Sequence, residues 1–457
     1  GISVLATLEQ LKVKPAVVVV SGASPRLLEA ASRSAIGHGF TVLGTLAKPF
    51  NPDALRQLLL KQKPNQPLAD APAQPKPKTL TLDMLQRAFA EQAFYVAYQP
   101  KIECRTTTLT GFEALCRLHL ADIGEVSPEQ FIPLCEQHGL INQLTRCVID
   151  NALPWFATFL QSHRQLASLS NIANVRLAIN ISALSFEQPD IFDYLTEQCH
   201  NWQLTPSSII LELTETSAMA DVVRSLDILT RLRLQGFHLS IDDFGTGFSS
   251  VLQLVRLPFS ELKIDKHFVS SAADSKESRL VISSIIDMAH ALGLTVTAEG
   301  IEDRRTLSFL QKKHCDTAQG FYIARPLAPD QIDAWVNQHQ DDKELARLKA
   351  LRALDILDSA PEERFDRIIR LAQRIVQVPA CSFSLMDQHR IWYKSKIGMP
   401  LNEIARKGSL CELAIAHNGS YCINDTLLHP DTCHNTLVVS APFIRFYAGH
   451  VIAAPNG

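Results

Sequence analysis

Short apolar runs alternate with longer amphipathic stretches through the central part of the chain, from about residue 80 to residue 340. The apolar runs have the length of buried strands, and the stretches between them repeat apolar residues at helical spacing. The predicted strands are 94–98, 109–115, 175–181, 209–213, 238–241, 262–264 and 294–298. The predicted helices between them include 128–139, 221–235, 277–292 and 304–312. Seven or eight such units in about 260 residues predict an α/β fold, a (β/α)₈ TIM-like barrel over residues 80–340.

The pattern differs on both sides of this region. Residues 1–62 contain strand-like runs at 16–20 and 40–43, with helix-like stretches between and after them, which is about half of an α/β domain. Residues 63–79 are rich in Pro, Ala and Gln and have no aromatic residue, so they predict an extended linker.

The last region, residues 341–457, begins with a charged stretch in which leucine recurs at positions 345, 348, 351 and 354. This spacing predicts a helix over 341–357, and a second helix is predicted over 362–376. Short strands and loops follow to the end of the chain, so we expect an α+β unit.

Composition and charge limit the kinds of protein that this sequence can encode. Hydrophobic residues make up 46% and charged residues 20% of the 457 residues, as in globular proteins. The net charge of −3 gives no general attraction for polymeric nucleic acid or for an anionic membrane. The apolar run at 16–23 is far shorter than the roughly 20 residues that cross a membrane. The ten cysteines form no CxxC pair, and we therefore expect a cytoplasmic protein without disulfides or structural zinc.

Acidic and amide side chains recur where the predicted strands of the central region end. They are Glu113, Asn180, Glu212, Asp242, Asp243 and Glu299, and Lys263 lies in the strand 262–264. Taken singly, each carboxylate would be a helix cap, a turn residue or a solvated side chain. In a (β/α)₈ barrel, however, the strand ends converge on one mouth. Five carboxylates there would repel one another without cations, and oxygen ligands suit Mg²⁺ or Mn²⁺.

The motifs that contain these residues resemble the EAL family of cyclic di-GMP phosphodiesterases. They are Tyr98-Gln99-Pro100, Glu113-Ala114-Leu115 with Arg117, Phe131-Ile132-Pro133-Leu134, Asn180-Ile181-Ser182, Glu212-Leu213-Thr214-Glu215, Asp242-Asp243-Phe244-Gly245-Thr246-Gly247, Leu262-Lys263-Ile264-Asp265, Ala298-Glu299-Gly300 and Gln319-Gly320. Their order and spacing extend over about 250 residues, which makes the resemblance specific.

The resemblance implies a hydrolase with two metal ions, Mg²⁺ or Mn²⁺, in each active site. The first ion would be bound by Glu113, Asn180, Glu212 and Asp242, and Asp242 would bridge to the second, beside Asp243 and Glu299. The catalytic residues would be Lys263, which orients water or stabilises charge on the phosphate, Glu299 as proton acceptor, and the ligand Glu113. The substrate would be cyclic di-GMP and the product the linear dinucleotide.

The family also suggests residues around the metals. Gln99, Arg117 and Gln319 resemble substrate-facing or supporting positions. The loop after Asp243 contains Gly245, Gly247 and Phe248, where the family usually has Tyr in place of Phe248, and Glu215 resembles the residue that pins this loop. In the family the loop couples the metal site to a dimer interface, so we expect a homodimer.

Both flanking regions resemble signalling domains. Residues 1–62 are similar to the second half of a receiver domain, with Ser21 and Lys48 at the switch and phosphate-contact positions. The strand that would carry the phosphorylated aspartate is not in the sequence, so we expect no phosphoryl transfer to this unit, and a sensor kinase would act only on an intact parent protein. Residues 341–457 resemble a signalling helix and a partial GAF domain, through motifs that include Trp392-Tyr393-Lys394-Ser395.

Three functions remain open at this point. The first is hydrolysis of cyclic di-GMP, which the complete set of acidic residues favours. The second is a catalytically silent effector that binds the dinucleotide. The third is a signal-relay module between the flanking regions.

Overall fold

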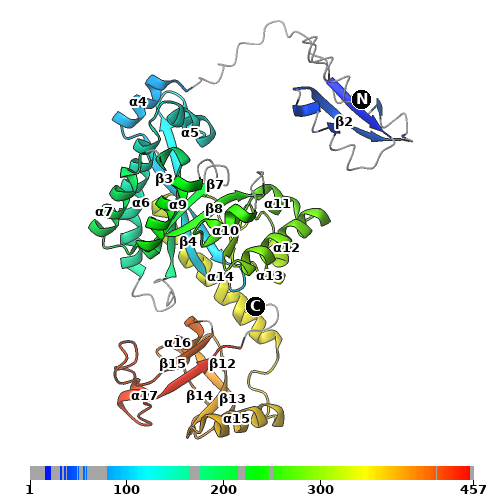
Figure 1. Ribbon diagram of the computed structural model, residues 1–457. Coiled ribbons are helices and arrows are strands. Elements are labelled where there is room, and N and C mark those ends of the chain that lie inside the picture. Colours follow the sequence, from blue (N-terminus) through cyan, green and yellow to red (C-terminus); the bar gives the residue numbers. More distant parts are fainter. Residues whose placement is uncertain are drawn as a thin grey trace. The chain divides into compact units, whose positions relative to one another are not determined.

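The computed structural model describes residues 16–21, 31–32, 35–37, 39–48, 50, 55–56, 58, 80–163, 174–186, 188–214, 222–245, 251–417 and 419–452. The chain forms two compact units, residues 1–78 and 79–457 (Figure 1). The predicted linker 63–79 lies outside the described residues.

In the first unit, strands β1 (Ala16–Ser21) and β2 (Thr41–Ala47) pair in parallel. Both strands predicted from the sequence are therefore present. The backbone N–H of Lys48 donates to the carbonyl of Ser21 at 2.8 Å, which places these two residues side by side at the end of the strand pair.

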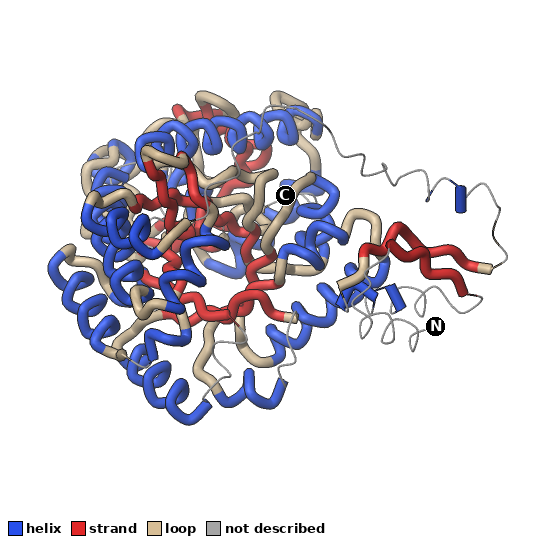
Figure 2. Tube along the Cα trace, turned by 90° about the horizontal axis from the view of Figure 1, so that it is seen from above, coloured by secondary structure: helices blue, strands red, loops and turns tan. Residues whose placement is uncertain are grey.

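Eight strands of the second unit form a closed ring, and Figure 2 shows helices around it. In spatial order they are β3 (Phe94–Glu103), β11 (Thr317–Ala318), β10 (Thr295–Ala298), β9 (Glu261–Ile264), β8 (His238–Phe244), β7 (Ile209–Thr214), β6 (Arg176–Asn180) and β4 (Leu109–Leu120). The pairing of β3 with β4 closes the ring, and the short β5 (Gly124–Val126) extends β4 at its edge. The predicted TIM-like barrel is thus present.

One strand departs from a regular (β/α)₈ barrel, because β3 is antiparallel to both of its neighbours, β4 and β11. The other neighbouring pairs in the ring are parallel. The reason is the connection: only residues 104–108 separate β3 from β4, and so short a turn can join antiparallel strands but not parallel ones.

Helices surround the barrel strands, and several of them begin at side-chain caps. The helices are α4 (Leu82–Ala90), α5 (Pro128–Gln137), α6 (Ile141–His163), α7 (Asp190–Asn201), α9 (Val222–Leu234), α10 (Val251–Arg256), α11 (Lys266–Ser271), α12 (Lys276–Ala291) and α13 (Arg304–Lys312). Asp303, for example, accepts a hydrogen bond from the N–H of Thr306 at 2.8 Å and fixes the start of α13, where the sequence predicts it.

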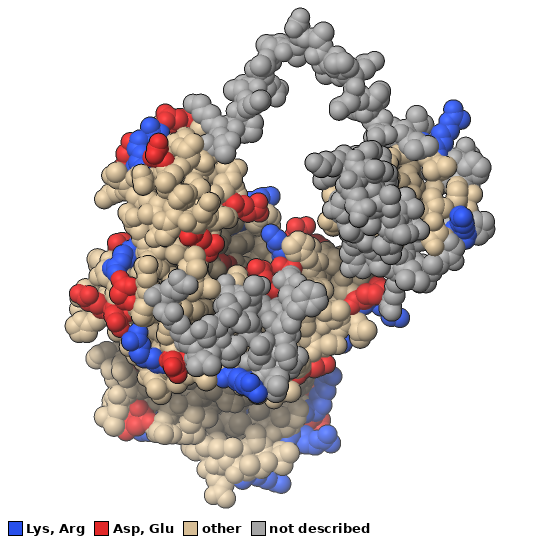
Figure 3. All heavy atoms as spheres, turned by 45° about the horizontal axis from the view of Figure 1, so that its top comes forward, with Lys and Arg blue, Asp and Glu red and all other residues tan. Residues whose placement is uncertain are grey.

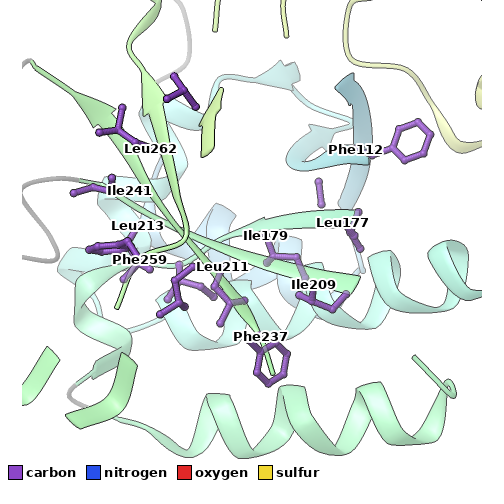
Figure 4. Close-up of a cluster of buried hydrophobic side chains, with 14 of the residues drawn as sticks. Phe112, Leu177, Ile179, Ile209, Leu211, Leu213, Phe237, Ile241, Phe259 and Leu262 are labelled. Atoms are coloured by element: carbon purple, nitrogen blue, oxygen red, sulfur yellow. The ribbon is translucent and has the colours of Figure 1, made fainter. Parts of the chain in front are cut away.

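The main core lies between the strands and this layer of helices. Alternate strand residues such as Leu177, Ile179, Leu211 and Leu213 point into it (Figure 4). The residues between them face the barrel interior, because successive side chains of a strand point to opposite sides. Several of these inward residues are polar and still buried: Gln99, Lys101, Glu113, Glu212, Ser240, Lys263, Thr297 and Gln319.

Helix α14 (Ile332–Ala353) runs through the position where the sequence placed a domain boundary, between residues 340 and 341. The predicted helix 341–357 therefore begins nine residues earlier, at Ile332, and ends at Ala353. No Gly or Pro interrupts residues 332–353, so nothing in the sequence ends the helix at the barrel.

The middle of helix α14 contacts both the barrel and the part of the chain that follows the helix. His339 Nε2 lies 2.7 Å from the carbonyl of Thr107, and Lys343 donates to Thr108 Oγ1 at 2.6 Å. Further along the helix, Arg347 donates to the carbonyl of Met386 at 2.6 Å.

The rest of the second unit is α+β. Strands β12 (Cys381–Met386), β13 (Arg390–Ile397) and β14 (Glu403–Ala405) form one antiparallel sheet, and β15 (Ser420–Ile423) pairs with β16 (Tyr447–His450) in another. The helices are α15 (Glu363–Val376), α16 (Leu410–His417) and α17 (Thr436–Val439). Among the described residues, no helix combines the length and the apolar character needed to cross a membrane.

Candidate metal centre at the strand ends

Lys263 lies at the centre of a buried group of carboxylates. Its Nζ is 2.5 Å from Glu299 Oε1, 2.7 Å from Glu212 Oε2, 3.2 Å from Asp242 Oδ2 and 3.8 Å from Glu113 Oε1. The five residues come from β4, β7, β8, β9 and the end of β10, so the barrel brings together residues far apart in the sequence. They lie toward the carboxyl ends of the parallel strands, where barrels of this class build their sites.

Amide side chains hold Glu113 from two sides. Asn180 Nδ2 donates to its Oε1 at 2.9 Å, and Gln319 Nε2 donates to its Oε2 at 2.6 Å. Gln319 Nε2 also lies 3.0 Å from Gln99 Oε1, and Gln99 in turn donates to the carbonyl of Ala324 at 3.0 Å. Gln99, Asn180 and Gln319 therefore belong to the same group as the carboxylates.

Asp242 and Asp243 both reach the site because the backbone of β8 is irregular there. Asp243 has a φ of 55°, in the left-handed region, and the register with β9 shifts between Ile241 and Phe244. Such a bulge re-aims a side chain that would otherwise point to the opposite side of the strand. One oxygen from each of Asp242, Asp243 and Glu299 lies within 4.8 Å of the others.

Burial and neighbouring charges shift the pKa values of these carboxyl groups in different directions. Burial alone would raise the pKa of Glu113, but Lys263 and Lys101 outweigh it and lower this pKa to about 2. Burial raises the pKa of Glu212 to about 7 and that of Glu299 to about 8, in spite of the nearby lysines. These shifts follow from taking charged groups out of water beside one another.

The pKa values of Lys263 and Asp243 are shifted as well. Burial disfavours the charged form of Lys263, but the surrounding carboxylates raise its pKa well above the ordinary value. Burial and the adjacent Asp242 raise the pKa of Asp243 to about 6. Protons and cations thus compete for the same oxygens, which is the situation in which a divalent ion displaces protons as it binds.

The donor set fits hard divalent ions. Carboxylate and amide oxygens are the ligands that Mg²⁺ and Mn²⁺ prefer, and the site offers these from Glu113, Asn180, Glu212, Asp242, Asp243 and Glu299. Gln319 Oε1 is buried and has no hydrogen-bond partner among the described residues, so the site also holds a free acceptor.

Other residues singled out in the sequence lie elsewhere. Arg117 donates to the carbonyl of Cys116 at 2.9 Å, and it is four residues beyond Glu113 on β4, roughly 13 Å along the strand. Gly245 has a φ of 98°, and a Cβ there would lie 3.0 Å from the ring of Phe268. Glu215, Gly247 and Phe248 lie outside the described residues.

Lys101 belongs to the site but was not predicted from the sequence. It is 3% exposed, and its Nζ lies 2.5 Å from Glu212 Oε1. The predicted strand ended at residue 98, so nothing in the sequence placed Lys101 on the same side of a strand as Gln99, two residues before it. A lysine between Pro100 and Ile102 reads as a strand-end residue unless the strand is known to continue to Glu103.

The surface around the barrel shows no large field of one sign on the face in Figure 3. Its described acidic and basic side chains are interspersed there.

A closed barrel with an oxygen-rich, acidic group at its strand ends defines a TIM-like barrel with a candidate divalent-metal centre. Residues 82–326 match the model of the EAL domain, and the chain belongs to this family.

Curated relatives share this region. The chain is 37% identical over 252 residues to the bifunctional diguanylate cyclase/cyclic di-GMP phosphodiesterase MucR of Pseudomonas aeruginosa. The aligned region covers 55% of the chain and 36% of MucR. It is 31% identical over 318 residues to the cyclic di-GMP phosphodiesterase RocR of the same organism, covering 69% of the chain and 78% of RocR. The chain spans about a third of the length of the first curated relatives that it matches.

Solved structures are similar as well. The phosphodiesterase of PaMucR in complex with c-di-GMP aligns with a TM-score of 0.51 at 37% identity, covering 55% of this chain and 98% of that chain. The EAL enzyme Bd1971 in its cAMP- and cyclic-di-GMP-bound form aligns with a TM-score of 0.54 at 29% identity, covering 68% of this chain and 74% of that chain.

Proposed function

We propose that the barrel is a metal-dependent phosphodiesterase that hydrolyses cyclic di-GMP to the linear dinucleotide. The observation that carries the proposal is the contact of Lys263 with Glu113, Glu212, Asp242 and Glu299, which gathers the acidic residues of four different strand ends. The names of MucR and RocR, and the c-di-GMP complex of PaMucR, support the choice of substrate.

The residues that would hold the first ion are Glu113, Asn180, Glu212 and Asp242. Those that would hold the second are Asp242, Asp243 and Glu299. When bound, two Mg²⁺ or Mn²⁺ ions supply Lewis acidity toward the phosphate and an activated water. Because the pKa of Glu113 is lowered to about 2, its carboxylate stays charged as a ligand at neutral pH.

Lys263 and Glu299 have roles in the chemistry itself. The ammonium group of Lys263 would stabilise negative charge that develops on a phosphoryl oxygen, in a buried site where such an interaction is strong. Glu299, whose Oε1 lies 2.5 Å from Lys263 Nζ, would act as the proton acceptor.

Substrate binding would use the residues around this group. Gln99 and Gln319 are buried beside Glu113 and can orient the reacting phosphate or its water. Arg117, further along β4, offers a planar fork that fits a phosphate or a guanine edge.

The decisive experiment is a hydrolysis assay on the full chain with cyclic di-GMP and either Mg²⁺ or Mn²⁺. We expect release of the linear dinucleotide and no turnover after chelation. Tight binding of cyclic di-GMP without turnover would instead identify a silent effector. A barrel that neither binds nor cuts it would support the signal-relay alternative.

We keep three finer interpretations as proposals. Residues 1–62 would be a partial receiver-like unit, which the parallel pairing of β1 with β2 supports. A sensor kinase would be a partner only of an intact parent protein. The α+β unit after α14 would be GAF-like. The protein would form a homodimer, which light scattering on a size-exclusion column tests directly.

A further inference from the structure

Two buried lysines reach Glu212, and they do so differently. Lys263 contacts four carboxylates, whereas the hydrogen bond and the ion pair of Lys101 both go to Glu212. Glu212 is 1% exposed, with Lys101 at Oε1 and Lys263 at Oε2. Its two oxygens are thus held from opposite sides.

Lys101 can reach this far into the barrel because of the strand that carries it. β3 continues to Glu103, and in its register with β4 Lys101 lies opposite Gly111. A Cβ on Gly111 would lie 2.4 Å from the carbonyl oxygen of Arg176, so the close approach of β4 and β6 requires glycine there.

Glu212, like Glu113, is held in place by neighbouring side chains. Glu113 receives hydrogen bonds from the amides of Asn180 and Gln319, whereas the hydrogen bonds to the Glu212 carboxylate come from Lys101 and Lys263. Outer partners of this kind fix the orientation of a metal ligand and are about as important as the ligand itself. A buried ammonium group is unfavourable unless it is paired with a negative charge, so a lysine in this position needs Glu212.

We propose that Lys101 is a positioning residue for the metal centre: by holding Oε1 it fixes the orientation of the Glu212 carboxylate, whose Oε2 contacts Lys263 among the other candidate ligands. This inference rests on the proposed function, since it assigns a role within the same site. It differs from a purely structural ion pair, which would contribute to folding stability without affecting metal binding.

The test is Lys101→Met in the full chain, with Mn²⁺ binding measured by calorimetry. Loss of an outer partner typically weakens metal binding about 10- to 100-fold, and we expect the half-saturating Mn²⁺ concentration to rise by such a factor. At saturating Mn²⁺, the KM for cyclic di-GMP should stay within about threefold of its original value, because Lys101 is buried below the site. The matched control is Lys343→Met, which removes a lysine whose ammonium bonds Thr108 in the β3–β4 turn.

A second measurement does not depend on a variant. In a crystal structure of the unaltered chain with Mn²⁺, Lys101 should remain on Glu212 Oε1 while Oε2 contacts the ion. Displacement of Lys101 by a bidentate Glu212 would overturn the proposal. So would a Lys101→Met protein that loses stability but binds Mn²⁺ as before, or more tightly. If the unaltered chain neither binds Mn²⁺ nor cuts cyclic di-GMP, the proposed function itself fails.

Discussion

Glu113 and Lys263 lie within 3.8 Å of each other, yet they should respond differently to substitution. Glu113→Ala removes a carboxylate ligand, and we expect loss of bound Mn²⁺ together with turnover. Lys263→Ala removes a positive charge, so metal content should persist while hydrolysis slows by about 10²- to 10³-fold. Bound Mn²⁺ measured in both purified variants separates the roles. Equal metal loss in the two would contradict the role given to Lys263.

The donor set also predicts inhibition by calcium. Ca²⁺ takes more oxygen ligands at longer distances than Mg²⁺ or Mn²⁺, so it should occupy the carboxylates of Asp242, Asp243 and Glu299 without giving a productive geometry. We expect hydrolysis in Mn²⁺ to fall as Ca²⁺ is added and to recover with excess Mn²⁺. Full activity with Ca²⁺ alone would show that the site does not require the tighter ions.

A histidine far along β8 from the site links stability to pH. Burial, with Arg176 and Arg233 nearby, lowers the pKa of His238 to about 4. Since the unfolded chain binds this proton near pH 6.5, the contribution of neutral His238 is complete above pH 6.5 and is lost as the pH falls toward 4. The slope for one proton is at most about 1.4 kcal/mol per pH unit.

We expect His238→Gln to flatten the decrease in the free energy of unfolding between pH 6.5 and pH 4, measured in urea. His200→Gln, at an exposed position on α7, is the matched control and should leave the slope unchanged. An identical slope in all three proteins would refute the assignment to His238.

At the scale of elements, β4 and β6 approach each other closely at Gly111. Because a Cβ there would lie 2.4 Å from the carbonyl oxygen of Arg176, Gly111→Ala must push β4 away from β6. Overpacking of this kind costs about 1–3 kcal/mol. It should also weaken Mn²⁺ binding, because the bond from Asn180 to Glu113 joins the same two strands. Gly37→Ala, in open space, is the control for both measurements.

Most elements of the barrel could be predicted from the sequence because strands and helices differ in period. The seven predicted strands all appear, and the helix at 304–312 has the predicted bounds. The direction of a strand cannot be predicted in this way, because apolar spacing is the same in parallel and antiparallel strands. The reversal of β3 was therefore not predicted. The α14 helix was divided at residue 340 since a change in composition does not break a helix.

The site likewise contains residues that could be predicted from the sequence and a residue that could not. Residues at strand ends, such as Glu212 and Glu299, could be singled out because strand ends converge in a barrel. Lys101 could not be singled out, because its partner Glu212 is 111 residues away in the sequence and lies on another strand. Pairing across a barrel interior depends on register and closure, which no single stretch of sequence contains.

At the scale of the whole molecule, the chain divides at residue 78 into two compact units. The second unit contains its own cores, in the barrel and under α5. We therefore expect a protein lacking residues 1–78 to fold, to unfold in urea with the same midpoint for the barrel, and to bind Mn²⁺ with unchanged affinity. Aggregation or weakened binding after the deletion would show that the barrel depends on the first unit.

The reversal of β3 changes how this part of the chain must be aligned with other barrels. In the parallel strands, a later residue lies nearer the open end. In β3 the order is inverted: Gln99 pairs with Glu113, and Lys101 pairs with the deeper Gly111. An added or lost residue in the turn at 104–108 would thus shift the floor of the barrel first, whereas the same change after any parallel strand would alter its rim.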